Sequence, residues 1–181
     1  MSRLDPRAPL VLDTATLPRS PGQMRTLSAT VPAPEDLGLD VISVPARSDL
    51  QLDLRLESVM EGVLVTGTVS AAAHGACVRC LEPVEQPLAI EVQQLYAYPG
   101  AASADDDETP QLEDDLVDLE PVLRDAVVLA LPLQPLCRDD CPGLCATCGA
   151  RLADDPEHHH DQLDPRWAAL LHLPDDSKER G

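Results

Sequence analysis

The residues best suited to chemistry in this chain are its six cysteines, which fall into three closely spaced pairs. The pairs are Cys77 and Cys80, Cys137 and Cys141, and Cys145 and Cys148. A gap of two residues lets both thiolates of one turn face a single ion, and Gly149 after the third pair permits a tight backbone turn. Three histidines, His158, His159 and His160, follow the same pair. Thiolates and imidazoles are preferred ligands of Zn²⁺, which structural sites hold in tetrahedral sets of four.

The six cysteines and two of the histidines make two complete sets of zinc ligands. One set closes within a short loop and contains Cys145, Cys148, His158 and His160. The other set joins the tip between two predicted strands to the end of a predicted helix, and contains Cys77, Cys80, Cys137 and Cys141. We favour this arrangement, with two zinc ions as structural cofactors, because it uses every cysteine.

Two alternatives remain open for these ligands. A single local site would close shorter loops and cost less chain entropy, and it would contain Cys137, Cys141, Cys145 and Cys148. That site leaves the Cys77 and Cys80 thiols as a spare pair and the histidines without a metal. The histidines would then be a solvated polar run, which needs no ligand role.

The cysteine pattern does not predict catalysis. A redox thiolate needs an activating helix start or cation, and Arg79 is the one obvious cation close to the Cys77 and Cys80 pair. Neither CxxC sequence opens a clear helix. A hydrolytic zinc needs an open coordination position and a general base, and no His-Glu-x-x-His arrangement occurs. We therefore expect no enzymatic activity, and a thiol-based redox or zinc-responsive regulator is the alternative function.

The chain is strongly acidic, with 32 acidic and 13 basic side chains and a formal net charge of −19 at pH 7. This charge repels phosphate, and no basic run provides the face that nucleic-acid binding uses. We therefore do not expect tight, direct RNA binding, and an acidic surface favours a basic protein partner instead.

The sequence predicts a cytoplasmic protein. Its N-terminus lacks an apolar stretch of signal-peptide length, and no segment approaches the length of a membrane span. Thiols stay reduced in the cytoplasm, so the six cysteines call for a role other than three disulfides.

Alternating apolar residues predict a strand-rich N-terminal part. Leucines alternate with polar residues over 50–56, and a second apolar run from Val63 returns after a turn, which predicts a hairpin over 50–70. A further strand is expected over 86–97, with a bulge or an end where the alternation changes phase at Leu95. Shorter strands are expected at 9–13 and 25–31. The core must be aliphatic, because the chain has one Trp, two Tyr and no Phe.

The period of the apolar residues changes after an acidic segment at 99–118, which we interpret as a mobile linker. Apolar residues then recur at helical spacing over 119–131, with Asp118 as the N-cap and Pro132 as the stop. The predicted inward residues are Leu119, Val122, Leu123, Ala126, Val127, Ala130 and Leu131. A second short helix is expected after Asp164, with Trp167, Leu170 and Leu171 inward.

The predicted fold class is α+β, with antiparallel strands, one amphipathic helix and a small Cys/His zinc-binding C-terminal segment. The predicted parts are residues 1–98, which carry the first cysteine pair, the acidic linker 99–118, and residues 119–174.

Several of these segments together resemble the YceD family, also known as domain of unknown function 177. The resemblance covers about Pro9 to Leu173 and rests on "RCLEPVEQPL", "ALPLQPLC", "CPGLCATCGARL" and "DPRWAALLHL". Some members place cysteines where His158 and His160 stand here, which implies that these histidines replace ligands. The family is described as large ribosomal RNA subunit accumulation proteins. The resemblance therefore implies a ribosome-biogenesis factor that supports the synthesis, processing or stability of large-subunit rRNA.

The acidic charge decides how such a factor would act. A clamp on rRNA needs a basic face, so we expect the chain to bind a basic ribosomal protein or the protein surface of a precursor particle. No membrane or small-molecule substrate is expected.

Overall fold

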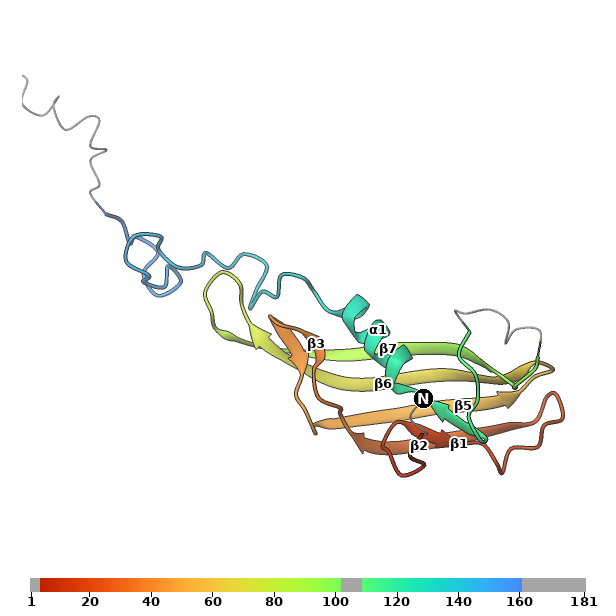
Figure 1. Cartoon of the computed structure of the whole chain (residues 1–181). Helices are drawn as coiled ribbons and strands as arrows, with labels where there is room; N and C mark the ends of the chain where they lie inside the picture. The colour runs from red at the N-terminus through yellow and green to blue at the C-terminus, as the bar shows by residue number, and fades with distance from the viewer. Residues whose placement is uncertain (1–3, 102–108, 161–181) are drawn as a thin grey trace, which may run out of the picture. The chain divides into compact units, whose positions relative to one another are not determined.

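The computed structural model describes residues 4–101 and 109–160. The chain forms two compact units, residues 1–139 and 140–181, and each is described by itself. All helices and strands found in the described residues belong to the first unit. The predicted α+β class is confirmed, because antiparallel strands are combined with one helix, α1 (Glu120–Ala130), as Figure 1 shows.

Eight strands form two antiparallel sheets in the described residues. The strands are β1 (Val11–Asp13), β2 (Met24–Pro32), β3 (Leu37–Leu39), β4 (Ile42–Val44), β5 (Asp49–Ser58), β6 (Gly62–Ala76), β7 (Pro83–Ala97) and β8 (Leu116–Asp118). In the larger sheet, β2, β5, β6, β4 and β3 are neighbours in that order, and β7 pairs with β6. The strands β1 and β8 form the smaller sheet.

The β5–β6 hairpin confirms the prediction made from alternating leucines. All four leucines of β5 are buried, and the residues between them, Gln51, Asp53 and Arg55, are exposed. A strand points successive side chains to opposite faces, so this alternation gives β5 one core face and one solvent face. The shorter predicted strands at 9–13 and 25–31 correspond to β1 and β2.

Strand β7 also forms where it was predicted, but without the bulge or end expected at Leu95. Its pairing with β6 runs in one unbroken register from Gly62 opposite Ala97 to Ala76 opposite Pro83. Tyr96 continues the buried face of Leu88, Ile90 and Val92, and Leu95 is a half-buried residue of the other face. The apparent phase change came from an apolar residue on the outer face.

Helix α1 begins one residue later than predicted. The N-cap is Leu119 and not the predicted Asp118. The Asp118 carboxylate still accepts a hydrogen bond from the Glu120 N–H at 3.0 Å. Pro121 lies in the first turn, and Pro132 follows the end, as expected. Ala130 is exposed rather than inward, whereas Leu131, directly after the helix, is buried as predicted.

Helix α1 covers one face of the sheet and closes its core. Its residues Leu123 and Val127 are fully buried, and the helix packs against β7 and β3 (Figure 1). The Tyr96 hydroxyl of β7 donates a hydrogen bond to the Asp118 carbonyl at 2.8 Å, which holds the start of the helix to the sheet. Burial, with a smaller effect of the nearby Asp118 charge, raises the pKa of Tyr96, so this donor stays protonated.

The end of the segment predicted to be a linker is part of the fold. Strand β8 occupies its last three residues, where Val117 is fully buried beside β1. Asp115 is also fixed, because its carboxylate pairs with Arg19 at 2.6 Å and its carbonyl accepts a hydrogen bond from the Thr14 hydroxyl at 2.7 Å. A few apolar residues among many acidic ones were enough to order this stretch.

Two further predictions concern a C-terminal helix and the lack of a membrane span. The predicted C-terminal helix, with Trp167, lies outside the described residues. Among the described residues, no helix is long and apolar enough to cross a membrane.

The packing of α1 can be tested with two leucines of the same helix. Leu123→Ala should lower the free energy of unfolding by about 2 to 5 kcal/mol, because it leaves a cavity under the sheet. Leu129→Ala is the matched control: this side chain is 86% exposed, and its removal should change stability by less than about 0.5 kcal/mol. Urea denaturation measures both. Equal losses for the two variants would show that α1 does not pack as described.

Candidate metal centres

The first cysteine pair lies in the turn between β6 and β7. The Cys77 N–H donates to the Glu82 carbonyl at 2.8 Å, and the Leu81 N–H donates to the Cys77 carbonyl at 2.9 Å. These bonds fold the turn back on itself and place Cys77 and Cys80 on its inner side. Leu81, directly after the second cysteine, has a left-handed backbone with φ of 62°.

The third cysteine pair builds the same turn a second time. The Cys145 N–H donates to the Ala150 carbonyl at 2.7 Å, and the Gly149 N–H donates to the Cys145 carbonyl at 2.8 Å. Gly149 has φ of 73°, which matches the backbone of Leu81 in the first turn. We call these two turns, residues 77–82 and 145–150, the first and the second knuckle. Each knuckle presents two thiols to one point.

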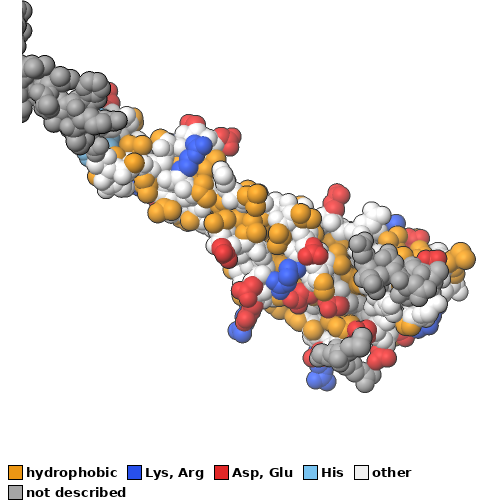
Figure 2. Space-filling model, turned by 45° about the horizontal axis from the view of Figure 1, so that its top comes forward, with side chains coloured by type: hydrophobic (Ala, Val, Ile, Leu, Met, Phe, Trp, Pro, Cys, Tyr) orange, Lys and Arg blue, Asp and Glu red, His pale blue; other side chains and the backbone are white. Residues whose placement is uncertain are grey.

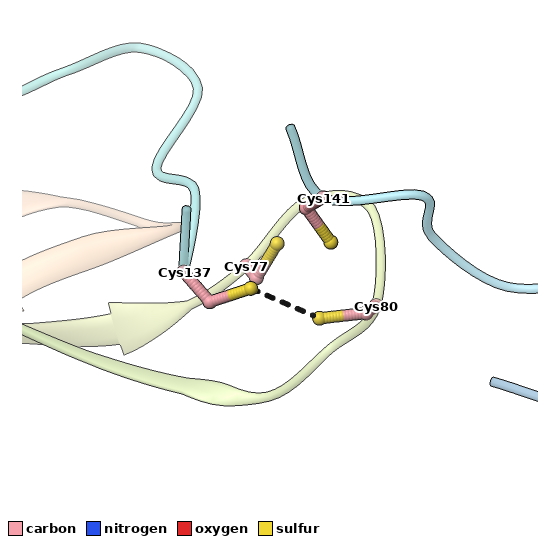
Figure 3. Close-up of side chains that lie close together, drawn as sticks. All are labelled: Cys77, Cys80, Cys137 and Cys141. Carbon is pink, nitrogen blue, oxygen red and sulfur yellow. Dashed lines mark hydrogen bonds between the residues drawn. The ribbon is translucent and has the colours of Figure 1, made fainter. Parts of the chain in front are cut away.

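Four cysteine sulfurs converge at the first knuckle. The sulfurs of Cys77, Cys80, Cys137 and Cys141 all lie within 4.8 Å of one another, and Figure 3 shows the four side chains pointing inward. The Cys80 and Cys137 sulfurs are 3.6 Å apart, and none of the six cysteines, all of them in the described residues, forms a disulfide. Three of the four residues are buried, and Cys137 is exposed.

Two thiols and two imidazoles converge at the second knuckle. The ligand atoms of Cys145, Cys148, His158 and His160 lie within 4.8 Å of one another. The Nε2 atoms of His158 and His160 are 3.0 Å apart, and each lies 3.2 Å from the Cys148 sulfur. This group is more open than the first, since none of its four residues is buried.

His159 differs from His158 and His160, because it does not belong to the second group. The His159 Nδ1 atom faces the Glu157 carbonyl at 2.9 Å and belongs to neither group. Asp155, which sequence reasoning missed, lies 3.9 Å from the Nδ1 of His158, on the far side of the ring from the cluster. A carboxylate beside the second nitrogen of a ligating histidine fixes the ring and its tautomer.

The two groups are the sets that ligand counting favoured, and both could hold a metal ion. Among the described residues, the local alternative of Cys137, Cys141, Cys145 and Cys148 is not one of the groups. The assignment of each residue as a ligand stays a prediction, because its test is metal binding itself.

Backbone amides favour the thiolate at the first knuckle. Burial alone would raise the pKa of the Cys77 thiol. Hydrogen bonds from the amides of Cys137, Arg79 and Cys80, with a smaller effect of the Cys80 side chain, outweigh burial and lower this pKa from 9.0 to about 6. The thiolate that a metal needs is therefore formed at neutral pH.

The second knuckle favours its first thiolate in the same way. The amides of Cys148 and Thr147 lower the pKa of the Cys145 thiol from 9.0 to about 6, although burial opposes them. The side chains of His158 and Cys148 add smaller lowering effects. In both knuckles, amides of the second and third residues after the first cysteine favour its thiolate, and at Cys77 the amide of Cys137 has the largest lowering effect.

Comparison with known proteins identifies a family whose sequence pattern spans both groups. The sequence pattern of the family described as large ribosomal RNA subunit accumulation protein YceD matches residues 65–174, a stretch that contains every residue of both groups. The chain belongs to the YceD family.

Related proteins occur in several bacteria. An uncharacterised protein of Mycobacterium tuberculosis is 47% identical over 169 residues, which cover 92% of this chain and 82% of the relative. A protein of Mycobacterium leprae is 43% identical and covers 92% of this chain and 78% of its own. The YlbN protein of Bacillus subtilis is 28% identical over 108 residues, which are 59% of this chain and 63% of that protein. No solved structure matches the chain.

Metal analysis should find two ions per chain, one for each group. Cys145→Ser should release one ion, and His158→Ala together with His160→Ala should release the same one. His159→Ala is the matched control and should leave both ions bound, because this imidazole faces the Glu157 carbonyl. One ion per chain that survives loss of both His158 and His160 would favour the local four-cysteine site instead.

Metal should be lost as the pH falls, because the thiols must be deprotonated to bind it. The folded pKa values of Cys77 and Cys145, about 6, lie below their ordinary value of 9.0. In the metal-free protein, the stabilisation from these thiolates is complete above pH 9 and is lost as pH falls toward 6. Protons then displace bound metal, which should be retained at about pH 7 and lost near about pH 5. Dialysis across this range followed by metal analysis measures the loss, and full retention at about pH 4 would contradict the assignment.

Proposed function

We propose that this protein is a non-enzymatic ribosome-biogenesis factor that supports the synthesis, processing or stability of large-subunit rRNA. Membership of the YceD family, whose description names large ribosomal RNA subunit accumulation, is the observation that carries this proposal. The charge supports an indirect mode of action. A chain with a net charge of −19 repels rRNA and attracts basic proteins, so it acts through a ribosomal protein or a precursor particle.

The surface of the first unit fits a basic partner. On the face shown in Figure 2, Asp and Glu side chains are spread over the sheet unit with isolated Lys or Arg side chains between them. Several of the cations are engaged by the protein's own carboxylates. Arg19 pairs with Asp115 at 2.6 Å, and Arg124 pairs with Glu120 at 2.7 Å. These cations are therefore poorly placed to form a phosphate-binding face.

The proposed metal is zinc in a structural role. Zinc held tetrahedrally at about 2.3 Å from each sulfur requires sulfurs roughly 3.8 Å apart. The distance of 3.6 Å between the Cys80 and Cys137 sulfurs is close to this value, and the shorter contacts to the imidazole nitrogens fit shorter Zn–N bonds. Each group supplies four ligands and leaves no coordination position for a substrate, which supports a non-enzymatic protein in the cytoplasm.

A thiol-based redox or zinc-responsive regulator is a second candidate, because the pKa values of Cys77 and Cys145 are lowered to about 6. Low-pKa thiolates are the ones that oxidants attack. Metal content after treatment with oxidant separates the candidates: an assembly factor keeps its zinc and its partner, whereas a regulator releases both reversibly.

The proposed function predicts salt-dependent capture of basic ribosomal proteins. Asp105→Asn, Asp106→Asn, Asp107→Asn and Glu108→Gln together should weaken capture and leave zinc content and stability unchanged. Asp115 is kept, because its pair with Arg19 belongs to the fold. A charge-matched control neutralises four exposed carboxylates of the first unit that lie away from the acidic segment, at Asp49, Glu61, Glu91 and Asp125. Equal losses in both variants would assign capture to total charge rather than to the acidic segment.

Two observations in cells and in solution complete this test. Depletion of the protein should lower mature large-subunit rRNA relative to small-subunit rRNA. Purified protein should not bind naked rRNA tightly at physiological salt, because both are negatively charged. Tight binding to naked rRNA in the absence of ribosomal proteins would falsify the proposed mode of action.

A further inference from the structure

The two knuckles have equivalent backbone hydrogen bonds but differ in the residue that follows the second cysteine. The residue after the second cysteine has a left-handed conformation in both, at φ of 62° for Leu81 and 73° for Gly149. Glycine adopts this conformation at no steric cost, whereas the Cβ of an L-residue clashes with its own backbone. Leu81 therefore strains the first knuckle where Gly149 relaxes the second.

The strain at Leu81 brings no packing gain to the fold. The residue is 68% exposed, so most of its apolar surface stays in water. Burial is what normally makes a leucine favourable, and here little burial offsets the strained backbone. A strained and exposed leucine points to a contact made outside the folded chain.

Leu81 lies at the edge of an apolar hollow in the first unit. The hollow has a volume of about 460 Å³, and its large exposed apolar side chains are Leu81 with Val41 and Val78, each of the valines being 42% exposed. Backbone bonds hold these residues in place: the Ala76 N–H donates to the Val41 carbonyl at 3.4 Å, and the Val78 N–H donates to the Pro135 carbonyl at 3.0 Å. The surface is therefore formed before any partner arrives, which lowers the entropy cost of binding.

The charge around the hollow selects the kind of partner. Asp40 lines it, and none of its lining residues, all in the described chain, is Lys or Arg. The exposed Glu85 stands opposite His74 of the hollow in the β6–β7 pairing. Zinc bound by four thiolates adds about two negative charges behind the knuckle. Arg79, between the two cysteines of the knuckle, is not among the residues that line the hollow.

We propose that Leu81, Val78 and Val41 form a docking surface for an extended segment of a basic protein that presents an apolar side chain flanked by Lys or Arg. This proposal rests on the proposed function, since it locates the site at which the basic ribosomal partner is held. The apolar anchor enters the hollow, and the flanking cations face Asp40 and the thiolate centre.

Leu81→Gly separates docking from folding, because it removes the anchor and relieves the strain together. Zinc affinity of the first group should rise about fivefold, as expected for release of a strained residue. Competition with a chromophoric chelator measures this affinity on the full chain. A loss of zinc affinity or of thermal stability in Leu81→Gly would show that Leu81 serves the fold, and would overturn the proposal.

Binding is then measured with a defined probe, the total proteins extracted from purified large ribosomal subunits. Immobilised zinc-loaded wild-type protein should retain one or a few basic proteins, which mass spectrometry identifies and which are then purified for titration. Leu81→Gly and Val78→Ser should each weaken this binding by about tenfold or more. Leu81→Met should bind like wild type, because methionine keeps the apolar volume. Met60→Ser is the control, since Met60 is 86% exposed in the β5–β6 turn, outside the hollow.

The other possible outcomes separate the proposed docking surface from the proposed function. Equal binding by wild type and Leu81→Gly would overturn the docking surface and leave the proposed function standing. Retention of no ribosomal protein by wild type would overturn both. Concentration-dependent self-association that disappears in Leu81→Gly would make the hollow an interface between two copies of this chain, and would overturn the assignment to a basic partner.

Discussion

The long pairing of β6 with β7 is the interaction on which the rest of the structure depends. Its register leaves six residues for the turn between Ala76 and Pro83, and these six residues form the first knuckle. At the other end, a Cβ on Gly62 would lie 2.0 Å from the Tyr96 carbonyl oxygen, so the close approach of the strands there requires glycine. A slip of one residue would turn the buried valines outward and would also move the two thiols of the knuckle. One set of hydrogen bonds therefore fixes both the core and the ligands.

Much of this arrangement could be predicted because it rests on local patterns. Alternating leucines define β5, and short cysteine spacings define knuckles, since both depend on neighbours in the sequence. The errors arose where tertiary packing decided. The sequence does not show that Tyr96 rather than Leu95 continues the buried face, because both side chains are largely apolar and the unbroken pairing with β6 decides between them. Nor does it show that Val117 pairs beside β1, since three residues are too few for a recognisable strand.

The two candidate metal centres place different demands on the ion. The first knuckle ends a hairpin whose strands already bury a continuous aliphatic core. The second knuckle lies in a unit where, among the described residues, Cys141 and Gly143 are the buried ones. So little apolar burial cannot offset the entropy lost on ordering such a segment. We therefore expect the fold of residues 140–160 to depend on a bound metal far more than the sheet does.

The acidic charge and the apolar hollow have complementary physical roles under the proposed function. Charge attraction acts at a distance and speeds encounter with a basic protein, but salt screens it within about 8 Å at physiological strength. Apolar contact at Leu81 is short-ranged and largely unaffected by such screening, so it supplies selectivity among the many basic proteins of a ribosome. The rRNA backbone carries a denser negative charge than this chain does. Under the proposed function, a basic protein released from the hollow is therefore drawn toward rRNA, and this difference in charge density favours its passage from this protein to the ribosome.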